Sequence, residues 1–205
     1  MIKRKILSIN IIGFLLLTSF CVFKNAAYGV APSMHPIQAC FTPGQNCTAQ
    51  IIQVLDTAKK TIFVQAYSFT SAPIARHLVE AKNRGVTVEV ILDKSQTSQS
   101  SYSASRFLLH QHIPIWIDYK PAIAHNKIII IDGERVITGS FNFTKAAQNK
   151  NAENLLIIQD SALAEIYTKN WRKRKAVSEA MNYSSSFQQP RSKPKRSWFT
   201  LNFLQ

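Results

Sequence analysis

Apolar positions along the chain switch repeatedly between helical spacing and strand-like runs. Stretches with apolar residues every three or four positions predict helices, and short β-branched or aromatic runs predict strands. The helical stretches are 48–60, 71–85, 105–112 and 161–175. The strand-like runs are 61–69, 86–92, 113–117, 123–131, 135–138 and 154–158. Helices alternating with strands, then a hairpin signal at Asp132-Gly133, predict an α/β domain with a mixed β-sheet flanked by helices.

Residues 1–29 have a different pattern from the rest of the chain. A basic start (Lys3 to Lys5) precedes an apolar run over 6–23, and small residues follow at Ala27 and Gly29. This order predicts a signal peptide cleaved after Gly29, and hence a protein of the periplasm or a secreted one. The alternative is an uncleaved anchor, because the apolar run is just long enough to span a bilayer. Only in that case is the membrane an expected partner.

The segment 30–47 holds two of the chain's three cysteines, Cys40 and Cys47, with Pro43-Gly44 between them. Export favours a small disulfide loop, and two half-buried thiols are the alternative. Three cysteines are too few for a disulfide-built miniprotein or a four-cysteine zinc site. The main domain is expected to follow this segment, over 48–176.

Basic residues are concentrated near the C-terminus. The chain has 25 Lys and Arg against 11 Asp and Glu, a formal charge of +14. Residues 30–168 hold 12 basic and 10 acidic residues, whereas residues 169–196 hold nine basic residues against one acidic. The region 177–205 is thus a basic tail, either a solvated one or an arm that binds phosphates. The excess charge indicates an anionic partner, nucleic acid or an acidic membrane surface.

Candidate chemistry lies in the predicted hairpin. Residues two apart in a strand share a face, so His125 and Lys127 are expected side by side. The returning strand is expected to bring Ser140 and Asn142 towards His125. No second carboxylate stands beside His125 to complete a metal cage, so neither a metal nor another cofactor is expected.

This set of groups suits a phosphodiester. Lys127 would supply a fixed positive charge to the non-bridging oxygens, and Ser140 and Asn142 would donate hydrogen bonds to them. His125 would attack phosphorus and form a covalent intermediate. A second group must protonate the leaving oxygen, and His125 of another copy across a two-fold axis could do so.

The order His-x-Lys-x4-Asp, followed by Gly-Ser-x-Asn, resembles the HKD signature of the phospholipase D superfamily. The segments 66–70, 81–86, 139–147 and 152–154 further resemble the small periplasmic Nuc-type endonucleases of that superfamily. The resemblance covers about residues 45–175.

Several expectations come from this resemblance alone. Because the chain carries one motif and the phospholipases carry two, the resemblance implies a homodimer with both motifs at the interface. It also implies metal-free phosphohistidine chemistry on a phospholipase D-like fold. Glu153 matches a family acid that orients the histidine ring, and Asp132 matches the motif aspartate, with a mainly structural role in the turn.

Three functions remain open at this point. The first is a metal-independent endonuclease that cleaves DNA; RNA is a further candidate substrate. The second is a phospholipase D-type hydrolase of anionic phospholipids, and the third is a non-catalytic nucleic-acid-binding module. Lys145 and Lys150 are candidate contacts for flanking phosphates, with solvated side chains as the alternative. Tyr67 and Phe69 are expected in the core, and the alternative is that the segment 67–70 reaches the site.

Overall fold

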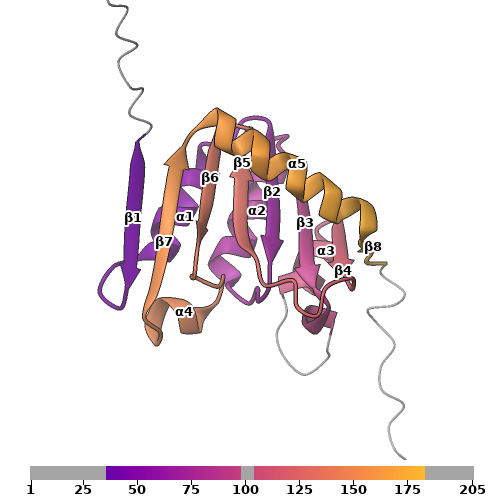
Figure 1. Ribbon diagram of the computed structural model, residues 1–205, viewed down its shortest axis with the longest axis horizontal. Coiled ribbons are helices and arrows are strands. Elements are labelled where there is room, and N and C mark those ends of the chain that lie inside the picture. Colours follow the sequence, from indigo (N-terminus) through magenta and orange to yellow (C-terminus); the bar gives the residue numbers. More distant parts are fainter. Residues whose placement is uncertain (1–35, 98–103, 183–205) are drawn as a thin grey trace, which may run out of the picture. The chain divides into compact units, whose positions relative to one another are not determined.

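The computed structural model describes residues 36–97 and 104–182 of the chain (Figure 1). The predicted signal peptide 1–29 and most of the predicted basic tail 177–205 lie outside these residues. Within them, eight strands form one sheet in the order β1-β7-β6-β5-β2-β3-β4-β8. The strands are β1 (Ile37–Thr42), β2 (Thr61–Ala66), β3 (Thr87–Asp93), β4 (Ile115–Asp118), β5 (Lys127–Ile131), β6 (Arg135–Gly139), β7 (Glu153–Gln159) and β8 (Glu179–Ala180). Parallel pairing joins β2 to β3 and β3 to β4, and the other neighbours are antiparallel, which confirms the predicted mixed sheet.

Helices cover both faces of this sheet. In Figure 1, α5 crosses the face turned to the viewer, and α1, α2 and α3 lie behind the sheet. The helices are α1 (Cys47–Asp56), α2 (Ala72–Asn83), α3 (Ala104–His110), α4 (Lys145–Asn149) and α5 (Ser161–Val177), and a 3₁₀ turn covers Lys94–Thr97. None of the helices in the described ranges is long and apolar enough to cross a bilayer.

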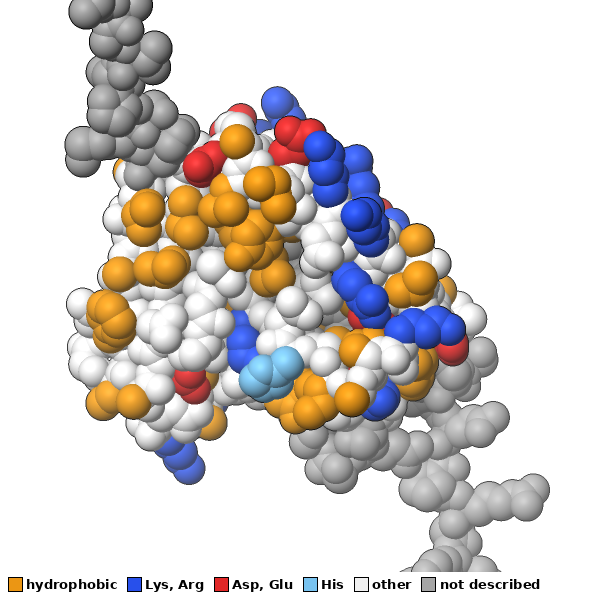
Figure 2. Space-filling view, viewed as in Figure 1, with side chains coloured by type: hydrophobic (Ala, Val, Ile, Leu, Met, Phe, Trp, Pro, Cys, Tyr) orange, Lys and Arg blue, Asp and Glu red, His pale blue; other side chains and the backbone are white. Residues whose placement is uncertain are grey.

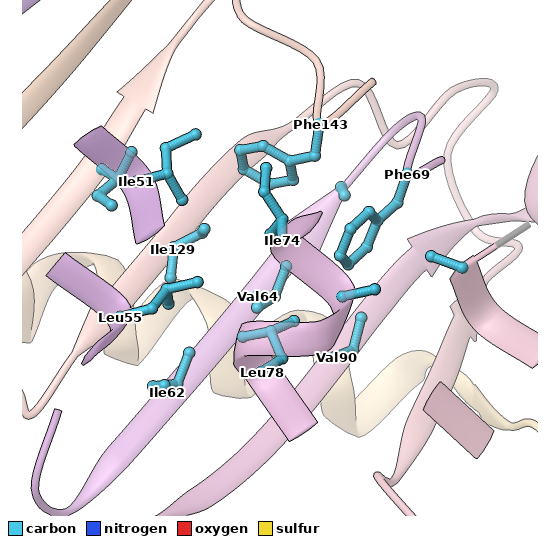
Figure 3. Packing of buried hydrophobic residues seen from close by; sticks show 14 of the residues in the cluster. Ile51, Leu55, Ile62, Val64, Phe69, Ile74, Leu78, Val90, Ile129 and Phe143 are labelled. Carbon is cyan, nitrogen blue, oxygen red and sulfur yellow. The ribbon is translucent and has the colours of Figure 1, made fainter. Parts of the chain in front are cut away.

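The core consists of two apolar layers, one on each face of the sheet. The larger layer packs α1 and α2 against β2, β3 and β5 (Figure 3). The smaller layer packs α5 against the opposite face, where Trp171 is 2% exposed and donates its indole N–H to the Val64 carbonyl oxygen. Ile129 and Ile131 of β5 enter the larger layer, whereas Ile128 and Ile130 enter the smaller one. The four isoleucines therefore fill both faces of an interior strand, as an unbroken apolar run predicts.

The predicted strand 123–131 is too long at its start. Strand β5 begins at Lys127, and residues 123–126 lie outside any strand. Its partner β2 ends at Ala66, which pairs with Lys127, and beyond this pair only one backbone hydrogen bond follows, from the Tyr67 N–H to the Asn126 carbonyl oxygen. His125 therefore lies in a loop, and the prediction that it shares one strand face with Lys127 is wrong.

Strand β1 falls in the segment 30–47 that the sequence separates from the domain. It pairs with β7 along its whole length, so the sheet extends further towards the N-terminus than residue 48. A disulfide joins Cys40 of β1 to Cys47 at the start of α1, with Cα atoms 5.7 Å apart. The structure thus has the disulfide that the sequence favours, and this bond ties an edge strand to a helix of the main layer.

Candidate active site

Four strand ends meet at one edge of the sheet. There β2 and β6 end, while β5 and β7 begin. The predicted site residues at this edge are His125 and Lys127 at the start of β5, Ser140 and Asn142 after β6, and Glu153 at the start of β7. Figure 2 shows a histidine at the surface with a basic side chain beside it. The topology thus gathers side chains from a 29-residue span of sequence.

The segment that carries His125 is held by its backbone. The buried carboxylate of Asp93 accepts the Ala124 N–H at 2.7 Å, and the Tyr67 N–H donates to the Asn126 carbonyl oxygen at 2.8 Å. Burial raises the pKa of Asp93, but N–H donors from Ser95 and Ala124 outweigh it, so this pKa lies below its ordinary value. The His125 side chain itself is exposed, and its ring centroid lies 4.6 Å from that of Tyr67. The imidazole is therefore anchored at its base and open to a large substrate.

Lys127 is a buried cation beside this exposed imidazole. Its side chain belongs to a residue only 7% exposed, and its Nζ donates to the His125 carbonyl oxygen at 2.9 Å. Nζ also lies 5.1 Å from the centre of the Tyr67 ring. Burial lowers the pKa of Lys127, and the nearby Glu153 carboxylate opposes that shift. The arrangement offers a fixed ammonium group to an incoming anion.

Ser140 and Glu153 form a pair that differs from the predicted roles. The Ser140 hydroxyl donates to Glu153 Oε2 at 2.6 Å and accepts the Asn154 N–H at 3.0 Å. The Asn151 side-chain amide donates to Glu153 Oε1 at 2.9 Å. The hydroxyl proton of Ser140 is thus directed at a carboxylate, not towards a substrate oxygen. Among the described residues, the Glu153 carboxylate is bonded to these two donors and not to His125, so it does not orient the imidazole here.

Asn142 has unused hydrogen-bonding capacity. Its Oδ1 is buried, without a hydrogen-bond partner among the described residues. An unpaired buried amide oxygen costs about 1–3 kcal/mol, and such groups need a functional or structural explanation. The amide stands two residues after Ser140, at the edge where a substrate would meet His125. Because this oxygen can only accept, a phosphodiester oxygen at this site would have to be held by the amide NH2 group of Asn142.

Gly139 shapes the turn that leads to these side chains. Its φ is +145°, and a Cβ at this position would overlap the Asn154 carbonyl group. That same carbonyl oxygen accepts the N–H groups of Ser140 and Phe141 at 3.0 and 3.1 Å. Only glycine permits this close approach of β6 to β7.

Asp132 lies at the other end of β5. The strand spans Lys127–Ile131, so Asp132 stands about 17 Å from Lys127 along the strand. Its carboxylate accepts the N–H groups of Lys59, Lys60 and Thr61 at 2.9, 2.7 and 2.9 Å. Asp132 therefore joins the β5–β6 turn to the start of β2, and it is not among the groups that could touch a substrate at His125.

Lys145 and Lys150 flank the short helix α4, which begins shortly after Asn142. Both side chains are exposed, and neither makes an ion pair with another described residue. Lys145 borders a hollow shared with Thr70 and Gln148. Their positions are compatible with contacts to a long anionic substrate.

Two contributing residues, Asp93 and Asn151, were not expected from the sequence as parts of the site. Tyr67 was expected in the core, with a position at the site as the alternative; it is half-buried and lies against His125, whereas Phe69 is fully buried as predicted. Asp93 accepts a hydrogen bond from the backbone N–H of Ala124, and Asn151 donates one to the carboxylate of Glu153. The sequence signal that points to a role in the site is an acidic residue at the end of a buried strand, as Asp93 is at the end of β3.

Comparisons with known proteins agree with this geometry. The family described as cardiolipin synthase, PLD-like domain, matches residues 51–174. The Rickettsia felis protein named phospholipase D is 48% identical over 140 residues, 68% of this chain and 70% of that protein. The Xenopus tropicalis protein named mitochondrial cardiolipin hydrolase is 25% identical over 147 residues, 70% of each chain.

Solved structures share the fold of the chain. The crystal structure of Nuc, a phospholipase D family member from Salmonella typhimurium, is 36% identical with a TM-score of 0.69, covering 72% of this chain and 98% of that one. NucT from Helicobacter pylori shares the fold, with 23% identity, a TM-score of 0.67 and coverage of 72% and 99%. The fold, the site at its sheet edge and these matches lead to one conclusion: the chain belongs to the phospholipase D superfamily, is similar to Nuc, and is a phosphodiesterase of that superfamily.

Proposed function

We propose that the protein is an exported, metal-independent endonuclease that cleaves DNA through a phosphohistidine intermediate, in an active site shared by two copies of the chain. The observation that carries the chemistry is the exposed His125 imidazole beside the buried Lys127 ammonium. A buried cation attracts the phosphodiester anion and stabilises the charge that develops on its oxygens. Export rests on the sequence of residues 1–29 alone.

The proposed reaction has two balanced steps. In the first, a neutral imidazole nitrogen of His125 attacks phosphorus, the bond from phosphorus to the leaving oxygen breaks, and a second imidazolium gives its proton to that oxygen. In the second, the same second imidazole takes a proton from water as the water oxygen attacks phosphorus. The phosphorus–nitrogen bond then breaks, which frees His125 and a phosphomonoester. Lys127 and the Asn142 amide hold the non-bridging oxygens in both steps.

A second copy of the chain is the proposed source of the second imidazole. The other described histidines are engaged elsewhere: His77 on α2 bonds Asp56, and His110 and His112 lie at the end of α3. Exposed apolar side chains support association between copies. Tyr119 and Ile123, 44% and 55% exposed, precede His125, and Figure 2 shows a further apolar patch on this face.

The basic surplus favours nucleic acid as the substrate. Residues 1–29 hold four of the 25 basic residues and no acidic one, so the mature chain has 21 basic against 11 acidic residues, a formal charge of +10. This charge and the exposed lysines at α4 suit a polyanion with many phosphates. The open position of His125 admits a bulky backbone. A phospholipase activity is the second candidate, because the Rickettsia relatives 44–48% identical to the chain are named phospholipase D.

The test compares three substrates in the presence of EDTA. Supercoiled plasmid, single-stranded RNA and cardiolipin vesicles are incubated with the mature protein, with His125→Ala and with the control His77→Ala. We expect plasmid nicking by the wild type and by His77→Ala, and none by His125→Ala. Headgroup release without nicking would replace the nuclease with the phospholipase. Salt-dependent DNA binding without turnover would leave a binding module, and activity lost on chelation would refute the metal-free mechanism.

A mixing experiment tests the shared site. Wild type and His125→Ala are mixed in equal amounts, allowed to exchange subunits and assayed. If both histidines serve one site, only pairs of two wild-type chains are active, and about a quarter of the activity remains. Independent sites would leave about half. Trapping of a phosphorylated His125 during turnover checks the covalent step separately.

A further inference from the structure

Tyr67 is the residue that contacts both reacting side chains, and the family motif does not contain it. It follows β2 directly, and its N–H donates to the Asn126 carbonyl oxygen, between the two side chains. Its ring lies 4.6 Å from the His125 ring, at an interplanar angle of 56°, and 5.1 Å from the Lys127 ammonium. We infer that Tyr67 is the positioning residue of this site: its ring limits the orientations of the His125 imidazole and holds the Lys127 ammonium by a cation–π interaction. The inference rests on the proposed function for its catalytic consequence only.

The His125 side chain needs an external support. It is exposed and belongs to a residue outside the strands, and its ring has no hydrogen bond to another described residue. An exposed imidazole samples several rotamers, and only some of them direct a nitrogen at phosphorus. The tilted contact with Tyr67 restricts these rotamers from one side. Removal of the ring should therefore slow the chemical step more than it weakens substrate binding.

The Lys127 ammonium needs a support of a different kind. Burial removes water from its charge, and the charged or titratable groups that face it are Glu153 from β7, His125 and Tyr67. The negative face of an aromatic ring replaces part of the lost hydration of a cation. Burial favours the neutral amine of Lys127. Tyr67 and Glu153 oppose this effect and favour the charged ammonium.

The test measures the titration of Lys127 directly, by NMR of its labelled side chain in the full protein. Tyr67→Leu should lower the pKa of Lys127 by about half a unit, because the ring is lost. Tyr67→Phe should keep the wild-type value, since the ring remains. The matched control Tyr167→Leu removes a tyrosine of the second core layer and should leave Lys127 unchanged. Because this titration needs no turnover, it tests the inference even if the proposed function fails.

Two further measurements separate positioning from packing. Replacement of Tyr67 by trifluorophenylalanine keeps the ring shape and removes most of its negative face, so it should lower the pKa of Lys127 as Tyr67→Leu does. On a substrate that the wild type cleaves, Tyr67→Leu should reduce kcat about tenfold with little change in KM, and Tyr67→Phe should restore it. A wild-type pKa of Lys127 in both the leucine and the fluorinated variants would overturn the inference, as would equal kcat values for Tyr67→Leu and Tyr67→Phe.

Discussion

Replacement of Asp132 separates a structural role from a catalytic one for the motif aspartate. Its carboxylate accepts three backbone N–H groups from residues 59–61, at the opposite end of β5 from His125. We therefore expect Asp132→Asn and Asp132→Ala to reduce the free energy of unfolding and to leave turnover per folded molecule almost unchanged.

The size of the loss follows from the three bonds. The N–H groups of Lys59 and Lys60 are exposed, so water replaces the carboxylate there at a cost of about 0.5–1 kcal/mol each. The Thr61 N–H is half-buried and costs about 1–1.5 kcal/mol. Asp132 also has a φ of +56°, which adds about 1 kcal/mol for alanine and little for asparagine. Asp132→Ala should thus lose about 3–4.5 kcal/mol, and Asp132→Asn, which keeps one oxygen, about 1–2 kcal/mol.

The pH dependence gives an independent check. Burial raises the pKa of Asp132, but the N–H donors of Thr61, Lys59 and Lys60, with the nearby Arg135, lower it further, so the folded pKa is below its ordinary value. A lowered pKa stabilises the folded state above the unfolded pKa of about 4, and this stabilisation is lost as the pH falls through the folded pKa. The stability gap between the wild type and Asp132→Asn should therefore shrink below about pH 4.

The measurements are urea unfolding from pH 7 to pH 3, and plasmid nicking at pH 7 normalised to folded protein. His125→Ala is the control that should lose turnover while it keeps wild-type stability. An Asp132→Asn protein as stable as the wild type and more than about a hundredfold slower would refute the structural assignment.

Three other changes have defined outcomes. Gly139→Ala places a Cβ against the Asn154 carbonyl and should lower the free energy of unfolding by about 3 kcal/mol or more in urea titration. The double change Cys40→Ala, Cys47→Ala opens a loop of sequence separation 7 and should lower it by about 2–3 kcal/mol, with activity retained at low temperature. Glu153→Gln keeps an acceptor for Ser140 but removes the negative charge that raises the pKa of Lys127. The alkaline limb of the pH–rate profile should therefore move to lower pH, and an unmoved limb would contradict the electrostatic role of Glu153.

The sequence predicts well those parts of the fold that are determined by residues close to one another in the chain. The run Ile128 to Ile131 has no polar position, so both of its faces must be buried, and the strand is interior. Ser71 caps α2 through its side chain, and Gly85 follows the helix with a φ of +91°. Asp132 and Gly133 both adopt the positive φ that their hairpin requires. Each of these signals acts within a few residues and needs no tertiary partner.

The remaining features depend on partners far away in the sequence. Strand β5 starts at Lys127 because β2 ends at Ala66, a residue 61 positions earlier. The Ser140 hydroxyl bonds Glu153 because the β6–β7 register pairs Gly139 with Leu155. The edge strands β1 and β8 have weak patterns of their own and exist through pairing with β7 and β4. Periodicity cannot supply such pairings, so the roles of Ser140 and Glu153 differ from those expected.

The early end of β2 is what makes the site chemically useful. A phosphoryl-transfer site of this kind needs a cation removed from water and, two residues away, a nucleophile that a polymer can reach. If the ladder continued through residues 123–126, His125 would be fixed within the sheet edge by strand pairing. Because the strands end at Ala66 and Lys127, with one further backbone bond from Tyr67 to Asn126, the lysine is the first residue of an interior strand and the histidine stands in the loop before it. The difference in exposure between the two motif residues therefore depends on a strand boundary that the sequence pattern misplaces.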